Sequence, residues 1–396
     1  MVLSTAGNMP HPTELLIQSE RVICSANRQD GPACVAIANG KIVDVSPTPP
    51  ETNLPRLRFL DALVLPGLVD VHAHPACRGS VWGVDPDEHM LPAGVTTVMS
   101  QGDAGADNWQ DYQRHTIRHS QTRVLMAMNP SAIGESTSSG CFECLDDVDV
   151  ERCIAAIADG GEHVPAVSVN VSRACCGDSD PREILQRGLQ VAGETKLPLL
   201  YGMRPPEEWS FEEQMSLLRP GDLVTYCFRS EPHNIIVDGR VHPAIRAAQQ
   251  RGILFDVTDG ATTLDFEVAR AAIDDGFLPD TISTDLHRKQ LCDDKTHNLP
   301  HTMSKLRAAG MESADVFAAV TSRPAAILQH PEPLGSLEPG APADLVALQT
   351  SVEPVTLSDV YGNQLQGFQW IPVCTVRNGR VVYLSDDARV DQQPAG

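Results

Sequence analysis

The chain has 396 residues, of which 42% are hydrophobic and 21% charged, so it can bury a large core and should form one large domain and a smaller one. Its formal net charge of −22 argues against nucleic acid or an anionic membrane as a partner, because a polyanion would be repelled. A small-molecule substrate fits better. No uncharged apolar run approaches the ~20 residues that a membrane span needs, so we expect no membrane span and a cytoplasmic location.

Two segments near the chain ends predict β-hairpins. Val35 to Val45 and Val373 to Tyr383 each alternate in polarity around an Asn-Gly pair, the strongest short-range hairpin signal. Neither hairpin would be stable alone. We therefore expect both to join one small β-sandwich domain built from residues 1–61 and 335–396.

Between these ends, residues 62–334 alternate between short apolar segments and segments of helical periodicity. Three of the latter, Pro181–Glu194, His242–Gln250 and Phe266–Asp275, have apolar residues at helix-like spacing. Eight strands are expected, over Leu65–His72, Gly94–Gln101, Arg123–Asn129, Ala166–Ser172, Leu197–Met203, Asp222–Phe228, Ile253–Asp259 and Thr281–Asp285. This alternation predicts an α/β fold, a (β/α)8 barrel of the TIM type.

The first barrel strand ends in two histidines, His72 and His74. Side chains two residues apart on a strand share a face, so both imidazoles can converge on one point beyond the carboxyl end of the strand. The last predicted strand ends in Asp285, with His287 two residues further on. Catalytic groups of such barrels lie at this end. His72, His74 and Asp285 are therefore candidate ligands of one divalent metal, zinc in preference to manganese or iron.

Several motifs resemble the amidohydrolase superfamily, and more closely its deacetylase-like branch, which is related to dihydroorotases. They are P-G-L-V-D-V-H-A-H at 66–74, A-G-V-T-T-V at 93–98, L-R-P-G-D-L-V-T at 218–225, S-T-D-L-H at 283–287 and L-G-S-L-E-P-G-A-P-A-D-L-V at 334–346. The resemblance covers nearly the whole chain. It implies the barrel, the split β-domain and hydrolysis of small-molecule amides.

The ligand set that this resemblance implies is incomplete. Relatives hold two metals with a carboxylated lysine on strand four and histidines on strands five and six. Here strand four offers Ser168 or Asn170, strands five and six offer Tyr201 and Tyr226, and Asp259 stands where relatives usually have histidine. A binuclear centre of the usual kind is therefore not expected, and we predict one metal.

The remaining polar groups at the strand ends are candidate substrate-binding residues. Tyr201 and Tyr226 are expected to donate hydrogen bonds or to fill space, because phenol, with a pKa near ~10, is a poor zinc ligand. Arg204 and Arg229 could bind a substrate carboxylate. A salt bridge from each arginine to an acidic residue of the protein is an alternative that the sequence favours at least equally. For His287, a supporting or surface role is favoured over ligation.

Cysteines offer a minor alternative. The eleven cysteines lack the spacing of a disulfide framework and are expected to be mostly reduced and buried. Cys141 and Cys144 form a C-x-x-C pair, but no second pair follows at zinc-finger spacing. Cys175 and Cys176 lie in the loop after strand four, and Cys227 adjoins Tyr226 on strand six. A thiolate at this end of the barrel could be recruited as a metal ligand, although buried cysteine is usually a small hydrophobe.

The favoured hypothesis is a metal-dependent hydrolase of an amide, cyclic amide or ester bond in a small molecule. Metal-activated water would attack, Asp285 would act as general base, and the same carboxyl would protonate the leaving group. A binding or scaffold protein that has kept the fold and lost the reaction is the main alternative. Oxygen chemistry at a non-haem iron site is the third hypothesis. Pairing into a homo-oligomer is compatible with the sequence.

Overall fold

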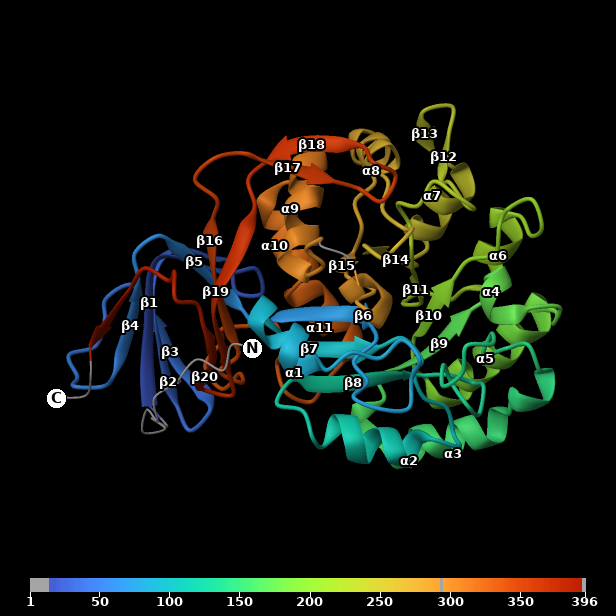
Figure 1. Cartoon of the computed structure of the whole chain (residues 1–396), viewed down its shortest axis with the longest axis horizontal. Helices are drawn as coiled ribbons and strands as arrows, with labels where there is room; N and C mark the ends of the chain where they lie inside the picture. The colour runs from blue at the N-terminus through green and yellow to red at the C-terminus, as the bar shows by residue number, and fades with distance from the viewer. Residues whose placement is uncertain (1–13, 293–294, 394–396) are drawn as a thin grey trace.

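The computed structural model describes residues 14–292 and 295–393. A parallel barrel sheet lies beside a second sheet that is built from the two ends of the chain (Figure 1). In the described part of the chain, the barrel sheet has eight strands that neighbour one another in chain order. They are β6 Leu68–Ala73, β7 Val95–Ser100, β8 Arg123–Met128, β9 Ala166–Asn170, β10 Leu199–Gly202, β11 Leu223–Val224, β14 Leu254–Thr258 and β15 Thr281–Ser283. The eight predicted strands and the barrel fold are confirmed.

Backbone hydrogen bonds join the two ends of this sheet. The N–H of Asp285 donates to the carbonyl of His72 at 2.8 Å, and the N–H of His74 donates to the carbonyl of Leu286 at 3.0 Å. The chain just after β15 is therefore held against the end of β6. This closure lies at the carboxyl ends of the strands, where function is expected in such a barrel.

Helices follow most strands and cover the outside of the barrel (Figure 1). Within the described residues they are α1 Pro86–His89, α2 Trp109–Tyr112, α3 Val150–Gly160, α4 Arg173–Cys176, α5 Pro181–Thr195, α6 Phe211–Leu217, α7 Pro243–Gln250, α8 Phe266–Asp274, α9 Leu299–Ala309, α10 Ser313–Ala319 and α11 Ser322–Leu328. Local chemistry sets their starts: Asp180 caps α5 ahead of Pro181, and Asp265 caps α8. The three predicted helices are confirmed to within one residue at each end.

The terminal sheet is built from both ends of the chain around its own hydrophobic cluster. Its strands within the described residues are β1 Glu14–Cys24, β2 Gln29–Ala38, β3 Lys41–Ser46, β4 Arg56–Phe59, β5 Ala62–Pro66, β16 Leu345–Thr350, β19 Trp370–Arg377, β20 Arg380–Leu384 and β21 Val390–Gln393. Two short hairpins stand apart from it, β12 Ile236–Val237 with β13 Arg240–Val241, and β17 Val355–Ser358 with β18 Gln364–Gly367.

Both predicted hairpins are present, as β2–β3 and β19–β20. Their turns place Asn39 and Gly40, and Asn378 and Gly379, in the left-handed region with φ between 50° and 75°, as a two-residue turn of this kind requires. The turns also pack against each other, since a β-carbon at Gly40 would lie 2.7 Å from Oδ1 of Asn378. Glycine is therefore needed at position 40 for space as well as for backbone conformation.

The passage into the barrel lies at Gly67, between β5 and β6. The structure pairs β5 with β16 and β1 of the terminal sheet, whereas sequence analysis assigned residues from 62 onward to the barrel. At Gly67 a β-carbon would lie 2.1 Å from Oγ1 of Thr96, so the chain passes too close to β7 for any side chain. The division of the chain at residues 61 and 335 stays a prediction, and part of it falls on residues 1–13 and 394–396, outside the described residues.

No helix in the described ranges has both the length and the apolar character needed to cross a lipid bilayer.

An ion network ties the terminal sheet to the barrel. The Asp344 carboxylate accepts hydrogen bonds from Arg123 of β8 at 2.9 Å, from Arg377 of β19 at 3.1 Å and from the backbone of Asn378 at 2.7 Å. Asp344 is only 7% exposed. Breaking a buried pair by removing one partner is costly, because the other charge stays buried without compensation.

We therefore predict that Asp344→Asn lowers the free energy of unfolding by about 3 kcal/mol, measured by urea unfolding. The control is Asp30→Asn, which removes the partner of Arg21 in a pair that is more than half exposed; its cost should stay below about 1 kcal/mol. Equal effects of the two substitutions would contradict this interpretation of the network.

Candidate functional site

The structure brings His72, His74 and Asp285 together at the carboxyl end of the barrel. Nε2 of His72 and Nε2 of His74 lie 3.5 Å and 3.3 Å from the same atom, Oδ1 of Asp285. All three residues are buried. Asp285 has a positive φ of 51°, a conformation that is uncommon for residues other than glycine. This backbone bend belongs to the segment that closes the barrel, and it directs the carboxylate between the two imidazoles.

The orientation of His74 is set by Asp103, which follows β7. Nδ1 of His74 lies 3.0 Å from Oδ1 of Asp103, and Oδ2 of Asp103 accepts a hydrogen bond from Ser100 at 2.6 Å. A proton on Nδ1 leaves Nε2 facing Asp285. Burial alone would lower the pKa of His74, but Asp103 and Asp285 raise it well above the usual value. For the Asp285 carboxyl, burial alone would raise the pKa, but hydrogen bonds from His72 and His74 lower it well below its usual range.

His72 is positioned from behind by β14. Its Nδ1 lies 3.4 Å from Oγ1 of Thr258 and 3.9 Å from Oδ2 of Asp256. The Asp256 carboxylate accepts hydrogen bonds from Thr258, Thr281 and Ser283. Such outer partners hold an imidazole in one orientation. Sequence analysis missed Asp103 and Asp256, although an acidic residue just after or within a barrel strand is a signal that could have found them.

The donor set has the residue types of a metal site and two of its three ligand–ligand distances. Two ligands about 2.0–2.1 Å from a tetrahedral cation lie ~3.4 Å apart, close to the separations between the imidazole nitrogens and Oδ1 of Asp285. Two imidazoles with one carboxylate suit zinc, manganese or iron and leave coordination positions open for water and substrate. Among the described residues, however, these three do not form a group whose ligand atoms all lie within 4.8 Å of one another, so the two imidazole nitrogens must move closer together to hold one cation.

Tyr226 lies beside this group. Its hydroxyl lies 3.2 Å from Nε2 of His72, and the two rings make an edge contact with centroids 5.1 Å apart. Burial, and then the charge of Asp285, raise the pKa of the phenol well above its usual value. Tyr226 therefore keeps its proton and acts as a hydrogen-bond donor. The guanidinium of Arg229 lies 6.0 Å from the centre of the Tyr226 ring and donates to Oγ1 of Thr262.

The structure does not bring Tyr201 and Arg204 to the triad. The Tyr201 hydroxyl donates to Oε1 of Gln214 in α6 at 2.8 Å. Arg204 donates from its guanidinium to Glu208 at 2.6 Å and from its backbone to Gln214 at 2.9 Å. Tyr201 and Arg204 are thus bonded to α6 and to the loop before it. For Arg204 the partner is a protein acid, Glu208, as in the alternative given above.

His287 forms a wall of the site together with Trp82. The His287 ring lies 6.1 Å from the ring of His74 and 5.5 Å from that of Trp82. Lys289 places its ammonium 4.1 Å from the centre of the Trp82 ring, a cation–π contact. Trp82 lies in the loop after β6, and sequence analysis did not single it out because nothing in a loop of this kind reveals its direction.

Comparison with known proteins identifies the family. A family model described as "Amidohydrolase family" matches residues 244–391. A deacetylase of Agrobacterium fabrum is 31% identical over 298 residues, which are 74% of this chain and 72% of the relative. A deacetylase of Brucella anthropi is 30% identical over 304 residues, 75% of each chain. The chain belongs to the amidohydrolase family.

Solved structures agree with this assignment. An adenine deaminase superposes with a TM-score of 0.84 at 26% identity, covering 93% of this amidohydrolase and 99% of the other chain. A dihydroorotase gives a TM-score of 0.82 at 26% identity, covering 94% and 99%. The predicted resemblance to the deacetylase-like branch is confirmed, and with it the prediction of a hydrolase that acts on carbon–nitrogen bonds.

The structure shows what replaces the strand-four lysine in this amidohydrolase. Ser168 accepts a hydrogen bond from Nε2 of Gln101 at 3.0 Å, and both side chains are buried. Asn170 is engaged with the backbone of Ser172. Asp259 bonds to Lys305 of α9 at 2.8 Å. Strand four therefore carries neutral Ser168, bonded to Gln101 after β7, and the acid after β14 is neutralised by a lysine.

A cluster that sequence analysis did not assemble lies next to the triad. Glu135, Cys141 and Cys175 have ligand atoms within 4.8 Å of one another, and Oε2 of Glu135 lies 3.9 Å from Nδ1 of His74. A hydrogen bond between the thiols raises the pKa of Cys141 and lowers that of Cys175. The other cysteine of the C-x-x-C pair, Cys144, is exposed.

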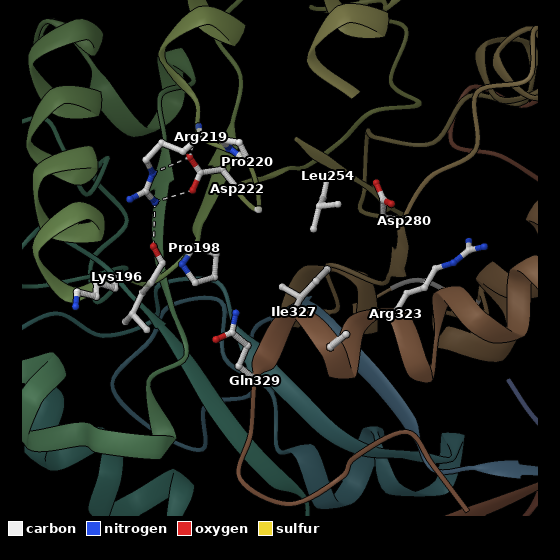
Figure 2. A pocket seen from close by; sticks show the side chains of 13 residues that line it. Lys196, Pro198, Arg219, Pro220, Asp222, Leu254, Asp280, Arg323, Ile327 and Gln329 are labelled. Atoms are coloured by element: carbon white, nitrogen blue, oxygen red, sulfur yellow. Dashed lines mark hydrogen bonds and ion pairs between the residues drawn. The ribbon is translucent and has the colours of Figure 1, made fainter. Parts of the chain in front are cut away.

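A hollow of about 490 Å³ lies at the opposite end of the barrel, before β10, β11, β14 and β15 (Figure 2). Two of its charged residues are paired with each other: Arg219 donates to Asp222 at 2.7 Å, and it also donates to the carbonyl of Leu197 at 2.9 Å. Figure 2 shows Arg219 turned toward Asp222, with Leu254 and Ile327 on the other side. Residues at this end of a barrel serve stability, so we do not assign the reaction to this hollow.

His233 is a buried histidine near the rim residue Arg229. It is 1% exposed, and within the described ranges neither ring nitrogen has a hydrogen-bond partner. Burial, and then the charge of Arg229, lower the pKa of His233 to about 3. In the unfolded chain this pKa is about 6.5.

We predict that stability falls as the pH drops from about 6.5 toward 3, because the unfolded chain then binds a proton that folded His233 does not. Between pH 7 and pH 5, the wild type should lose roughly 2 kcal/mol of unfolding free energy that His233→Leu retains. Urea unfolding at both pH values measures this. His119→Gln, at an exposed position, should keep the wild-type pH dependence; the same slope in His233→Leu would refute the prediction.

Proposed function

We propose that this amidohydrolase is a metal-dependent hydrolase of an amide, cyclic amide or ester bond in a small molecule, with a divalent cation, zinc in preference to manganese or iron, held by His72, His74 and Asp285. The observation that carries the proposal is that two imidazole nitrogens lie 3.3 and 3.5 Å from one carboxylate oxygen. Asp103 and Asp256 support it, because each faces the other ring nitrogen of one imidazole, the arrangement of metal-ligating histidines.

When bound, the cation would lower the pKa of a coordinated water toward ~7 and polarise the substrate carbonyl. With the imidazole nitrogens bound to the cation, Asp285 would lose the hydrogen bonds from His72 and His74 that lower its pKa; it could then accept the proton of the attacking water and return it to the leaving group. Tyr226 keeps its phenol proton and donates it in a hydrogen bond to the oxygen on which negative charge develops. Trp82 and His287 close one side of the site and limit access of bulk water.

For the substrate, we propose an acylated amine that carries a carboxylate, such as an N-acetyl amino acid. The two relatives described above are named deacetylases. Arg229 places positive charge beside Tyr226, and Lys289 places it beside Trp82. A guanidinium or an ammonium there can hold a substrate carboxylate while the acyl group reaches the triad. This arrangement retains the predicted role of Arg229 and adds Lys289.

A binding protein that has lost the reaction is the second candidate. The neutral Gln101–Ser168 pair favours it, because this pair removes the lysine on which relatives build a two-metal centre. Metal content and turnover in the same preparations separate the two candidates.

We predict that protein purified without chelators carries a cation that depends on His72 and Asp285. His72→Ala and Asp285→Asn should both lose that equivalent by elemental analysis, and hydrolysis of N-acetyl amino acids should fall by at least about 10²-fold. Tyr201→Phe is the matched control, because its hydroxyl bonds to Gln214, and it should stay within a few-fold of wild type. A metal-free protein that cannot be loaded would overturn the proposal; metal binding without turnover would favour the binding protein.

We also predict that Asp103→Asn weakens cation binding by about 10- to 100-fold, since the amide no longer stabilises the orientation and charge of His74. Competition with a chromogenic chelator measures the affinity. Asp111→Asn changes an exposed acid paired with Arg114 and should leave the affinity unchanged. Wild-type affinity in Asp103→Asn would exclude a supporting role for Asp103.

A further inference from the structure

Two loops at the barrel mouth bring a carboxylate and two thiols together. Glu135 and Cys141 lie in the loop after β8, and Cys175 lies in α4 after β9. Their ligand atoms lie within 4.8 Å of one another, Cys141 is buried, and Glu135 and Cys175 are largely buried. In a tetrahedral zinc site with bonds of about 2.3 Å, two thiolate sulfurs are ~3.8 Å apart, so the loops need to close by about 1 Å or less.

The backbone holds these loops in contact. The N–H of Phe142 donates to the carbonyl of Cys175 at 2.8 Å. A β-carbon at Gly140 would lie 2.5 Å from that same carbonyl oxygen, so only glycine lets the Cys141 loop approach so closely. The segment of Glu135 is fixed from two sides, because its N–H donates to Gly102 and its carbonyl accepts from Val81. The three side chains therefore project from a preformed frame.

We propose that Glu135, Cys141 and Cys175 form a second cation site of this enzyme, selective for a soft divalent ion such as zinc. Thiolates favour zinc over magnesium, calcium or manganese. Three protein ligands leave one coordination position open, as in catalytic rather than structural zinc sites. The site differs in its residues from the second site that the family resemblance implies, whose lysine and histidines this chain lacks; the two have in common only strand four, β9, which Cys175 follows.

The second site adjoins the first one. Oε2 of Glu135 lies 3.9 Å from Nδ1 of His74, whose Nε2 faces Asp285, so the two sites are neighbours across one imidazole ring. A part for the second cation in the reaction of the triad rests on the proposed function. Binding of that cation by Glu135, Cys141 and Cys175 does not, because it needs no intact triad. A cation there would also neutralise a carboxylate and two thiolates that are otherwise costly to keep charged inside the protein.

The experiment is a titration of metal-free, fully reduced protein with Co²⁺, followed by absorbance. A thiolate ligand produces an intense near-ultraviolet charge-transfer band that nitrogen and oxygen ligands do not. Wild type should bind two equivalents and show the band. Cys141→Ser and Cys175→Ser should each lose the band and one equivalent, and Glu135→Gln should keep the band with an affinity reduced at least about 10-fold.

The controls separate this inference from the proposed function. His72→Ala should lose the triad equivalent but keep the band, and Cys144→Ser, at the exposed position of the C-x-x-C pair, should match wild type. No band in reduced wild type, or a band that survives in both Cys141→Ser and Cys175→Ser, would overturn the second site whether or not the triad binds metal. Circular dichroism of each variant confirms that a lost band does not reflect unfolding.

Discussion

The backbone closure between β15 and β6 is the constraint on which the site depends. Two hydrogen bonds, from Asp285 to His72 and from His74 to Leu286, join residues that are more than two hundred positions apart in the chain. The same residues supply the imidazoles and the carboxylate, so ring closure and assembly of the triad are one event. The left-handed conformation of Asp285 is strained, and the hydrogen bonds of the closure offset this strain because they hold the backbone on both sides.

Around this closure, acidic groups outnumber basic ones. Asp103, Asp256, Asp285 and Glu135 all lie within 3.9 Å of a ring nitrogen of His72 or His74. Burial also raises the pKa of Asp70, which bonds to Thr284, to about 7. Placing several carboxyls near two imidazoles in a region of low solvent access is unfavourable unless positive charge compensates them. Cations at the triad and at the Glu135, Cys141 and Cys175 cluster would both supply that charge.

The sequence was sufficient for the barrel, because each strand is a short apolar run and strand ends in parallel sheets share one edge. The same rule predicted that His72, His74, Asp285 and Tyr226 would share one edge, and the structure places them together. It did not predict the bonds of Tyr201 and Arg204 to residues in and before α6, which are set by packing that a strand pattern does not encode. It could not find Glu135 or the contact of Cys141 with Cys175, since loop residues distant in sequence meet only through the fold, with Gly140 permitting the approach.

The pairing of β5 with β16 has a consequence for biosynthesis. Residues 62–66 find their strand partners at residues 345–349, so the amino-terminal strands leave the ribosome long before the segment that completes their sheet. Until nearly the whole polypeptide has been translated, β5 lacks β16 and β4 lacks β21, so both present edges that can pair with other chains. Because the first strands pair with the last ones, we expect the chain to be most prone to aggregation while it is still being translated.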